Sequence, residues 1–296
     1  MTARLGREMT LPHFSVAEEG RQAGNKSSGT IDLMPFTGQH LGAATRLSQA
    51  AGWPHRSEDW MLGLSVSEGV VALNEGRVAG TGLCSRFGEV ATLNMIIVDK
   101  AMRGRGIGRL IMERLIDLAG ERELRLVATR DGLPLYEKLG FRPEGLVLQH
   151  QGEVRAPDAG LAVEVAEGAD IGDIAAMDRE ASGMERGALL ARIAGDGTVL
   201  RTGGGFALLR RFGRGQVVGP VVASGEEPAQ MLIAAAASRC HGSFLRIDLP
   251  ESAGLCGFVE GLGLQRTGGG VAMIRNGRAR ALGRMRTFAL VSQALG

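Results

Sequence analysis

A glycine-rich turn between a predicted strand and a predicted helix constrains this chain more than any other feature. The apolar run Met95–Val98 leads into Asp99-Lys100-Ala101-Met102-Arg103-Gly104-Arg105-Gly106-Ile107-Gly108. Apolar residues then recur at the spacing of an amphipathic helix, at Leu110, Ile111, Leu115 and Leu118. Glycines at such a turn let backbone N–H groups approach a ligand, and a helix N-terminus adds partial positive charge. The turn therefore predicts a site for a pyrophosphate, although an isolated glycine-rich string is more often only a tight turn.

The residue spacing of this turn differs from that of the Walker phosphate loop and from that of the Rossmann glycine motif. No Gly-Lys-Ser/Thr follows it, and the three-glycine Rossmann spacing with a downstream acid is missing. Arg103-x-x-Gly106-x-Gly108 instead resembles the Arg/Gln-x-x-Gly-x-Gly/Ala signature of the GNAT superfamily of N-acetyltransferases. Downstream, residues 135–141 read Leu-Tyr-Glu-Lys-Leu-Gly-Phe and are similar to the family's Leu-Tyr-x-Lys-x-Gly-Phe segment. Together the two matches make a quite specific resemblance.

The resemblance covers residues 30–150 and implies a strongly bent mixed sheet in which two central parallel strands splay apart. It also implies acetyl-CoA as cofactor, with pantetheine in the gap between those strands and the backbone of Ile96, Ile97 and Val98 pairing with it. The pyrophosphate would be cradled by Arg103, Gly104, Arg105, Gly106, Ile107, Gly108 and Arg109. The family often has an asparagine seven residues before the tyrosine, and this chain has Thr129 there, so that contact is shorter or absent.

The predicted elements alternate in a mixed α/β order. A first strand at 30–34 precedes a helical region that reaches Leu64, and three antiparallel strands follow within 70–98. The amphipathic helix begins at Ile107 and ends at Gly120. Residues 124–128 read as a buried strand, 133–139 as a short helix, and the chain from Phe141 as returning strands that finish near His150.

The second half of the sequence repeats the first. Leu135, Glu137, Leu139 and Gly140 recur 123 residues later as Phe258, Glu260, Leu262 and Gly263. The same shift places Glu226–Met231 on the glycine turn and Val259 on Tyr136. Two carboxylates would repel a phosphate there, so we expect a degenerate copy that binds no cofactor and either walls the acceptor cleft or supports the first domain.

The domain layout follows from this repeat. We predict a flexible leader at 1–29, a catalytic domain at 30–150, a polar linker at 151–160 and the degenerate domain at 161–296. The whole chain resembles bacterial two-domain GNAT proteins whose second half is a reduced acetyltransferase domain.

Acyl transfer to an amine needs a proton donor for the leaving thiolate, an oxyanion donor and a base. Tyr136 is the only tyrosine in the chain and is the predicted general acid, and a strand N–H at Ile96 or Ile97 is the predicted oxyanion donor. The base stays open: water could relay the proton, and Asp59, Glu89 and Asp131 are weak candidates. Candidates for the acceptor region, each with a packing role as the alternative, are Asn94, Trp53, Trp60, His55 and His40.

Composition limits the partners. A formal net charge of +2 argues against non-specific attraction to nucleic acid or lipid, and the basic run Arg275–Arg286 is expected to be a solvated face. Cys84, Cys240 and Cys256 have neither disulfide nor metal spacing, which indicates a cytoplasmic protein without a metal site. The expected substrate is a primary amine of a small molecule or a peptide. The alternative is a non-catalytic acetyl-CoA-binding or regulatory module.

Overall fold

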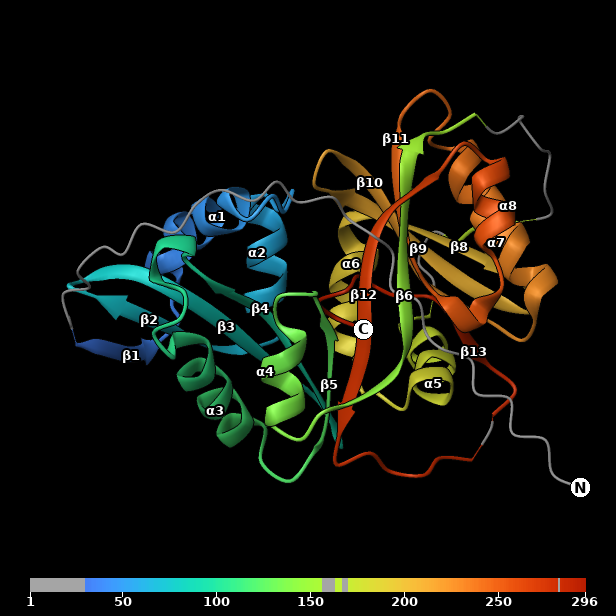
Figure 1. The fold of residues 1–296 in the computed structure, drawn as a ribbon. Helices are drawn as coiled ribbons and strands as arrows, with labels where there is room; N and C mark the ends of the chain where they lie inside the picture. The colour runs from blue at the N-terminus through green and yellow to red at the C-terminus, as the bar shows by residue number, and fades with distance from the viewer. Residues whose placement is uncertain (1–29, 156–162, 167–169, 282) are drawn as a thin grey trace, which may run out of the picture.

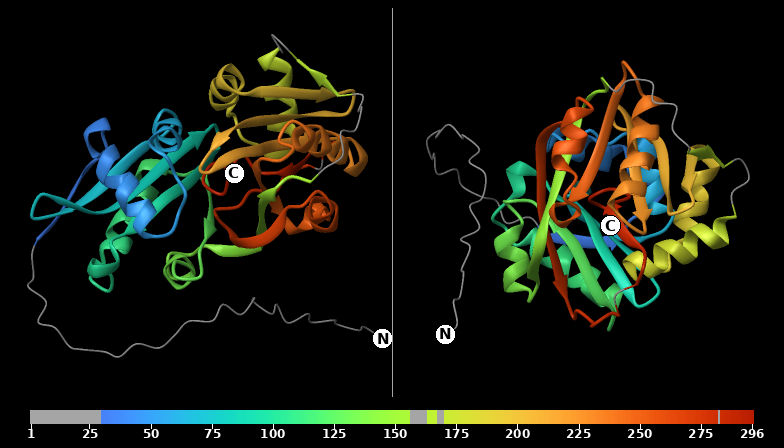
Figure 2. Two further views of the ribbon diagram at one scale, coloured as in Figure 1. Left: turned by 90° about the horizontal axis from the view of Figure 1, so that it is seen from above. Right: turned by 90° about the vertical axis from the view of Figure 1, so that its right-hand side faces the viewer.

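The computed structural model describes residues 30–155, 163–166, 170–281 and 283–296. The predicted leader and residues 156–160 of the predicted linker lie outside the described residues. Two α/β lobes stand side by side, and long strands run between them (Figures 1 and 2). No helix in the described part of the chain is long and apolar enough to cross a membrane.

The first lobe holds the elements that the sequence predicts, with two differences. The helical region is two helices, and a single strand, β6, replaces the returning strands expected from Phe141. The elements are β1 (Ile31–Pro35), α1 (Leu41–Ala50), α2 (Ser57–Leu64), β2 (Glu68–Asn74), β3 (Arg77–Phe87), β4 (Val90–Val98), α3 (Ile107–Ala119), β5 (Glu123–Ala128), α4 (Leu133–Lys138) and β6 (Arg142–Glu153).

The second lobe repeats this order. Its short helix α8 lies 123 residues after α4, as the sequence repeat predicts. The elements are β7 (Glu164–Val165), α5 (Ile171–Ser182), α6 (Gly187–Asp196), β8 (Thr198–Thr202), β9 (Gly205–Phe212), β10 (Gly215–Ala223), α7 (Glu226–Ser238), β11 (Phe244–Pro250), α8 (Cys256–Gly261), β12 (Gln265–Arg275) and β13 (Arg286–Ala289).

The two lobes exchange their last long strands. The strands form one sheet in the order β1-β2-β3-β4-β5-β12-β6-β11-β10-β9-β8-β7. Strand β12 of the second lobe lies between β5 and β6 of the first, with Val271 opposite Ala128 and Gly270 opposite Val147. Strand β6 pairs in turn with β11 of the second lobe. Strands β12 and β6, which pair at the centre of Figure 1, therefore complete the sheets of both lobes.

Helices cover both faces of the sheet in each lobe, which explains why the central strands are apolar on both sides. Helix α3 packs on one face of the first lobe, and α1 and α2 pack on the other. Helix α3 lies very close to β3, since a Cβ built on Gly80 or Gly82 would meet Ile111 at 2.8 and 2.6 Å. These two glycines fix how near the helix comes to the sheet.

The central parallel strands separate in both lobes, and among the described residues a further strand lies in the gap of the second lobe but not in that of the first. Strands β4 and β5 pair over Val90–Thr92 and then diverge. Strands β10 and β11 pair at Gln216 and Val217, after which β13 runs antiparallel along β10. The bent sheet with splayed strands is thus present twice, and β13 fills the second gap.

An inter-lobe contact occupies part of the basic run Arg275–Arg286. The backbone N–H of Arg278 donates to the buried carboxylate of Glu123 at 2.9 Å, and the Arg280 guanidinium donates to it at 2.7 Å. Both arginines are exposed, as expected of the basic run, and they also serve as the cationic and N–H partners that a buried carboxylate on β5 requires.

Candidate functional site

A β-bulge in β4 lies just past the point where β4 leaves β5. Met95 and Ile96 together oppose Gly82 of β3, between the pairs Asn94–Leu83 and Ile97–Thr81. Met95 has a φ of 51°, a left-handed conformation that is uncommon outside glycine. The Thr81 hydroxyl donates to the Met95 carbonyl at 2.9 Å and so supports the bulge. Bulges of this kind interrupt the ladder and free backbone groups for other partners.

A groove of about 570 Å³ follows β4 from this bulge to the start of α3. Of the eleven residues predicted to bind the cofactor, all but Arg105 line this groove: Ile96, Ile97, Val98, Arg103, Gly104, Gly106, Ile107, Gly108, Arg109 and Thr129. The Arg105 guanidinium lies 3.2 Å from the Met102 sulfur instead. The structure therefore gathers into one groove residues that are up to 33 positions apart in the sequence.

The glycine turn ends the groove with an arrangement suited to an anion. Gly104 and Gly106 have φ values of 76° and 80°, which a residue with a side chain rarely adopts. The first turn of α3 carries no acidic residue, so its unpaired N–H groups and partial positive charge face no competing carboxylate of their own helix. Arg103 pairs with exposed Asp131 at 2.9 Å beside the groove.

Tyr136 lies between this groove and a second cavity, and it lines both. Its side chain is buried, and that burial raises the pKa of its phenol to about 12. A Cβ on Gly132 would lie 3.2 Å from the phenol oxygen, so this glycine makes room for the hydroxyl. The phenol therefore stays protonated at neutral pH, in the state that can donate.

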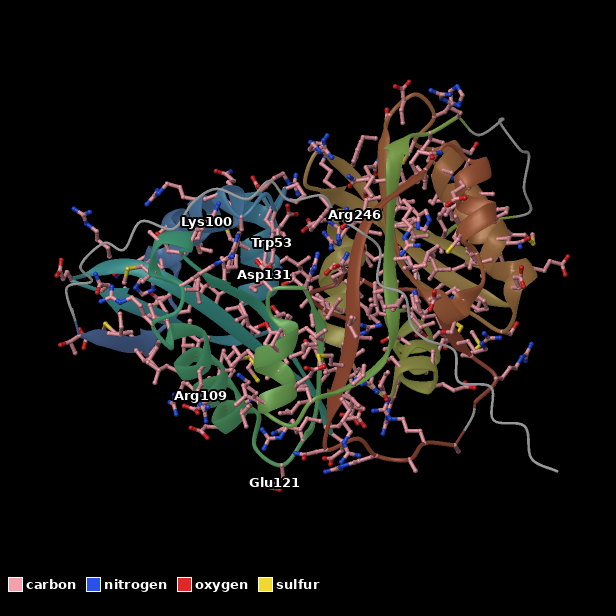
Figure 3. All side chains as sticks on the ribbon, viewed as in Figure 1. Trp53, Lys100, Arg109, Glu121, Asp131 and Arg246 are labelled. Atoms are coloured by element: carbon pink, nitrogen blue, oxygen red, sulfur yellow. The ribbon has the colours of Figure 1, made fainter. Side chains whose placement is uncertain are left out.

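The second cavity has a volume of about 240 Å³ and lies between the lobes. It shares Trp53, Ile96, Thr129 and Tyr136 with the groove, so the two spaces meet beside the tyrosine. The three residues predicted for the acceptor region, Asn94, Trp53 and His55, all line it. The second lobe contributes Phe212, Arg246, Gly269, Ser292, Gln293 and Ala294. In Figure 3, Trp53 and Asp131 lie on the side of the first lobe that faces Arg246.

Both lobes match a known domain family. The acetyltransferase (GNAT) domain matches residues 66–143, and a second form of the same domain matches residues 174–289. The chain belongs to the GNAT superfamily. It is a tandem-domain, acyl-CoA-dependent N-acetyltransferase of that superfamily.

Similar proteins span nearly the whole chain. The uncharacterised N-acetyltransferase YitH of Bacillus subtilis is 28% identical in an alignment of length 287 that covers 90% of this chain and 98% of YitH. A putative acetyltransferase from Pyrococcus horikoshii has a TM-score of 0.79 at 18% identity and covers 94% of this chain and 100% of its own. A tandem GNAT protein of the clavulanic acid biosynthesis pathway has a TM-score of 0.60 at 15% identity, covering 85% and 100%. The two structures share the tandem fold.

The carboxylates of this GNAT protein that the sequence offered as bases are held in ion pairs. Burial alone would raise the pKa of Asp59, but hydrogen bonds from Arg56 and from the Gly213 backbone outweigh it and leave the pKa lowered. Glu89 is exposed and pairs with Arg278. Among the described residues that line the groove and the cavity, Asp131 is the only carboxylate, and it is exposed and paired with Arg103.

The two histidines of the acceptor region lie in different places. His55 lies in the cavity wall with its ring centroid 5.6 Å from Trp53 and 5.6 Å from Phe212. Desolvation by burial lowers the pKa of His55 to about 4, so its imidazole is neutral at pH 7. His40 lies outside the cavity, where its Nδ1 accepts from the backbone N–H of Thr37 at 3.0 Å. Trp60 is fully buried in the core and does not line the cavity, so its packing role is the one that the structure shows.

Sequence reasoning missed the polar residues that the exchanged strands and the second lobe bring to the cavity. Gln149 comes from β6, Arg246 from β11, and Gln293 from the segment after β13. One signal was present, because Arg246 and Asp248 interrupt the apolar run Phe244–Pro250 at a spacing that places both on one face of a strand. The pair is buried and makes four hydrogen-bond contacts of 2.9 to 3.3 Å.

Proposed function

We propose that this protein transfers the acetyl group of acetyl-CoA to a primary amine of a small molecule or a peptide. The observation that carries the proposal is that the groove and the inter-lobe cavity meet at one residue. The glycine-turn groove and the inter-lobe cavity share Tyr136, so an acyl donor in the groove and an amine in the cavity would come together beside its hydroxyl.

The groove fits acetyl-CoA, which supplies the acetyl thioester. Pantetheine would lie along Ile96–Val98 in the gap between β4 and β5, and the pyrophosphate would lie on the glycine turn at the start of α3. Three features support this placement: the splayed strands, the two left-handed glycines and the absence of acidic residues in the first turn of α3. Thr129 also lines the groove, so its shorter side chain would face the same ligand as the family asparagine.

In the proposed reaction a C–N bond forms, a C–S bond breaks, the amine loses a proton and the sulfur gains one. The backbone N–H of Ile96 or Ile97, beside the bulge, would stabilise the oxyanion. The Tyr136 phenol would donate its proton as the C–S bond breaks, in a buried environment that raises the proton affinity of a thiolate as well. Because no buried, unpaired carboxylate lines the cavity among the described residues, water would carry the proton from the amine.

Catalysis in this proposal belongs to residues 30–150, and residues 161–296 form the degenerate copy. The second lobe would wall the acceptor cavity through β9, β11 and the segment after β13. The unpaired thiols of Cys84, Cys240 and Cys256 fit the reducing conditions of the cytoplasm, where we place the protein.

The experiment is a thiol-release assay with the full chain, acetyl-CoA and a panel of primary amines that includes amino acids, polyamines, aminosugars and peptides. We expect amine-dependent release of CoA with at least one class. If acetyl-CoA binds but no amine raises the release of CoA above the rate of acetyl-CoA hydrolysis, the chain is a non-catalytic acetyl-CoA-binding module. Calorimetric titration of acetyl-CoA in parallel separates these two functions.

A further inference from the structure

A largely buried cluster of charged residues lies beside the inter-lobe cavity, and its guanidinium groups outnumber its carboxylates. It contains three guanidinium groups, Arg56, Arg210 and Arg246, and two carboxylates, Asp59 and Asp248. Arg210 and Arg246 are each 7% exposed, Asp59 is 9% exposed and Asp248 is fully buried. The neighbouring His55 is uncharged at neutral pH because burial lowers its pKa to about 4. The side chain of Arg56 is 33% exposed, so its charge is partly solvated, but it engages Asp59 and leaves the buried Arg210 without a close carboxylate, which is costly without an anion.

Arg210 is the least compensated member of the cluster. Its nearest carboxylate oxygen, on Asp59, lies 3.9 Å from Nη1, and Asp59 already accepts from Arg56 at 2.9 Å. The remaining contacts of Arg210 are to two backbone carbonyls at 3.4 Å, and its buried Nε has no partner among the described residues. The buried guanidinium without a close carboxylate is thus on the second lobe, and like that of Arg246 it lies against the ring of Phe212.

Arg246 is the member of the cluster that lines the cavity. Its Nε and Nη2 both donate to Asp248, and its guanidinium carbon lies 5.1 Å from the centroid of Phe212, so the group is held in one orientation. Its Nη1 makes no hydrogen bond to any of the described residues. Asp248 also accepts from Gln293 at 2.9 Å, so its own oxygens are fully engaged. Nη1 of Arg246 is therefore an open cationic donor at this wall.

We propose that the acceptor is a compact amine that also carries a carboxylate, and that the carboxylate binds Nη1 of Arg246. This inference rests on the proposed function and names the substrate class of that site. A volume of about 240 Å³ is below the roughly 300 to 1,000 Å³ of pockets that hold drug-sized ligands, which fits a molecule of the amino-acid class. Asn94, beside the bulge, has a buried Oδ1 with no partner in the described part of the chain, which suits an N–H donor of the amine.

The test compares amino acids with their own amides, which keep the amine and remove the charge of the carboxylate. A series from glycine to aminohexanoic acid, each with its amide, also varies the spacing between amine and carboxylate. For the full chain we expect at least one acid to exceed its amide in kcat/KM by about 10- to 100-fold, the range of a charge-assisted hydrogen bond.

The variant is Arg246→Met combined with Asp248→Leu, because removing the arginine alone would leave a buried carboxylate unpaired. We expect the preference for the acid to fall to less than about 3-fold, through a higher KM for the acid, while amide turnover and acetyl-CoA affinity stay level. Arg246→Lys should keep part of the preference. Arg211→Met, which removes an exposed arginine of the same lobe, is the matched control and should keep all of it.

The outcomes separate the two proposals. If amides and acids are acetylated equally well by the full chain, the carboxylate inference is wrong and the acetyltransferase assignment stands. If the double variant binds acetyl-CoA and still prefers the acid to the same degree, Arg246 is not the carboxylate site. If acetyl-CoA binds but neither series releases thiol, while another amine class does, the acceptor lacks the predicted carboxylate. If no amine of any class is acetylated, the proposed function itself has failed.

Discussion

The two lobes have the same fold, yet they differ at the place where a cofactor would bind. In the first lobe, residues 99–106 separate β4 from α3 and present two left-handed glycines to an open groove. In the second, only Ser224 and Gly225 separate β10 from α7, and Glu226 and Glu227 form the first turn of the helix. The turn of the second lobe is therefore shorter, and its glycine, Gly225, is extended rather than left-handed.

The gap between the central strands differs even more. In the second lobe, β13 pairs with β10, and the Leu290 N–H donates to the Asp248 carbonyl of β11 at 2.9 Å. A Cβ on Gly219 would lie 1.9 Å from the Leu290 carbonyl oxygen, so the chain passes directly against β10. The comparison teaches that the terminal strand of a duplicated fold can fill the gap in which we propose that the other lobe binds its ligand, while the packing of the lobe is kept.

The largest effect that this comparison predicts is the loss of folding when the lobes are separated. A chain truncated after His150 keeps β5 and most of β6 but lacks β12, which pairs with both. Two strands and their apolar faces would then be exposed, so we expect no cooperative thermal transition by circular dichroism and self-association by size-exclusion chromatography.

A chain cut once between Arg155 and Val163 keeps every strand and is the control. It should elute as one particle and unfold cooperatively. A truncated chain that is monomeric, unfolds cooperatively and acetylates amines would show that the exchanged strand is dispensable.

The next largest effect is expected for Tyr136→Phe, because Val259 stands at the corresponding place in α8 and has no proton to give. The substitution removes the hydroxyl and keeps the ring that packs against Phe141. Positioned acid catalysis contributes about 10²- to 10⁴-fold, so kcat should fall by that range while acetyl-CoA affinity and Tm stay level. Single-turnover rates with a saturating amine measure this directly. An unchanged chemical rate would make Tyr136 a packing residue.

Much of the first lobe could be predicted from the sequence, because its signals are local. The turn at 99–108 and the segment at 135–141 each encode their own backbone geometry, and Gly120 ends α3 as expected, with a φ of 63°. The residues of the groove also follow from these segments, since a strand, a turn and a helix that are consecutive in sequence line it together.

The acceptor cavity could not be predicted in the same way, because its walls come from pairings between distant strands. Gln149 on β6 is near Arg246 because β6 pairs with β11, and that pairing depends on β12 leaving its own lobe. Strand exchange leaves each strand's apolar pattern unchanged, so nothing in residues 142–153 distinguishes a partner in one lobe from a partner in the other. The Phe141 region was accordingly expected to form returning strands of its own.

A smaller effect is expected for a carboxylate introduced into the glycine turn. Gly106→Glu places a negative charge at the start of α3, in a conformation with a φ of 80° that disfavours a side chain. Acetyl-CoA affinity should fall by about 10- to 100-fold, measured by calorimetry. The matched control is Gly225→Glu before α7, where φ is extended and no cofactor is expected, so affinity should not change. Equal losses in both variants would contradict a single site in the first lobe.

The smallest effect on acetyl-CoA binding is expected for a variant that, from the sequence alone, would be predicted to gain a second binding site. Replacing Glu226 and Glu227 with serine removes the charges that would repel a phosphate at α7, and it costs about 0.3 to 1 kcal/mol for each favourable interaction with the helix N-terminus. We still expect calorimetry to find one acetyl-CoA per chain, because β13 occupies the gap beside β10 and the turn remains two residues long. The control adds Gly106→Glu to the same variant, which should weaken the remaining site as it does in the unmodified chain. If a second equivalent of acetyl-CoA binds, and still binds after Gly106→Glu is added, then the two carboxylates alone prevented binding to the second lobe. The strand in the gap of that lobe must then be displaceable.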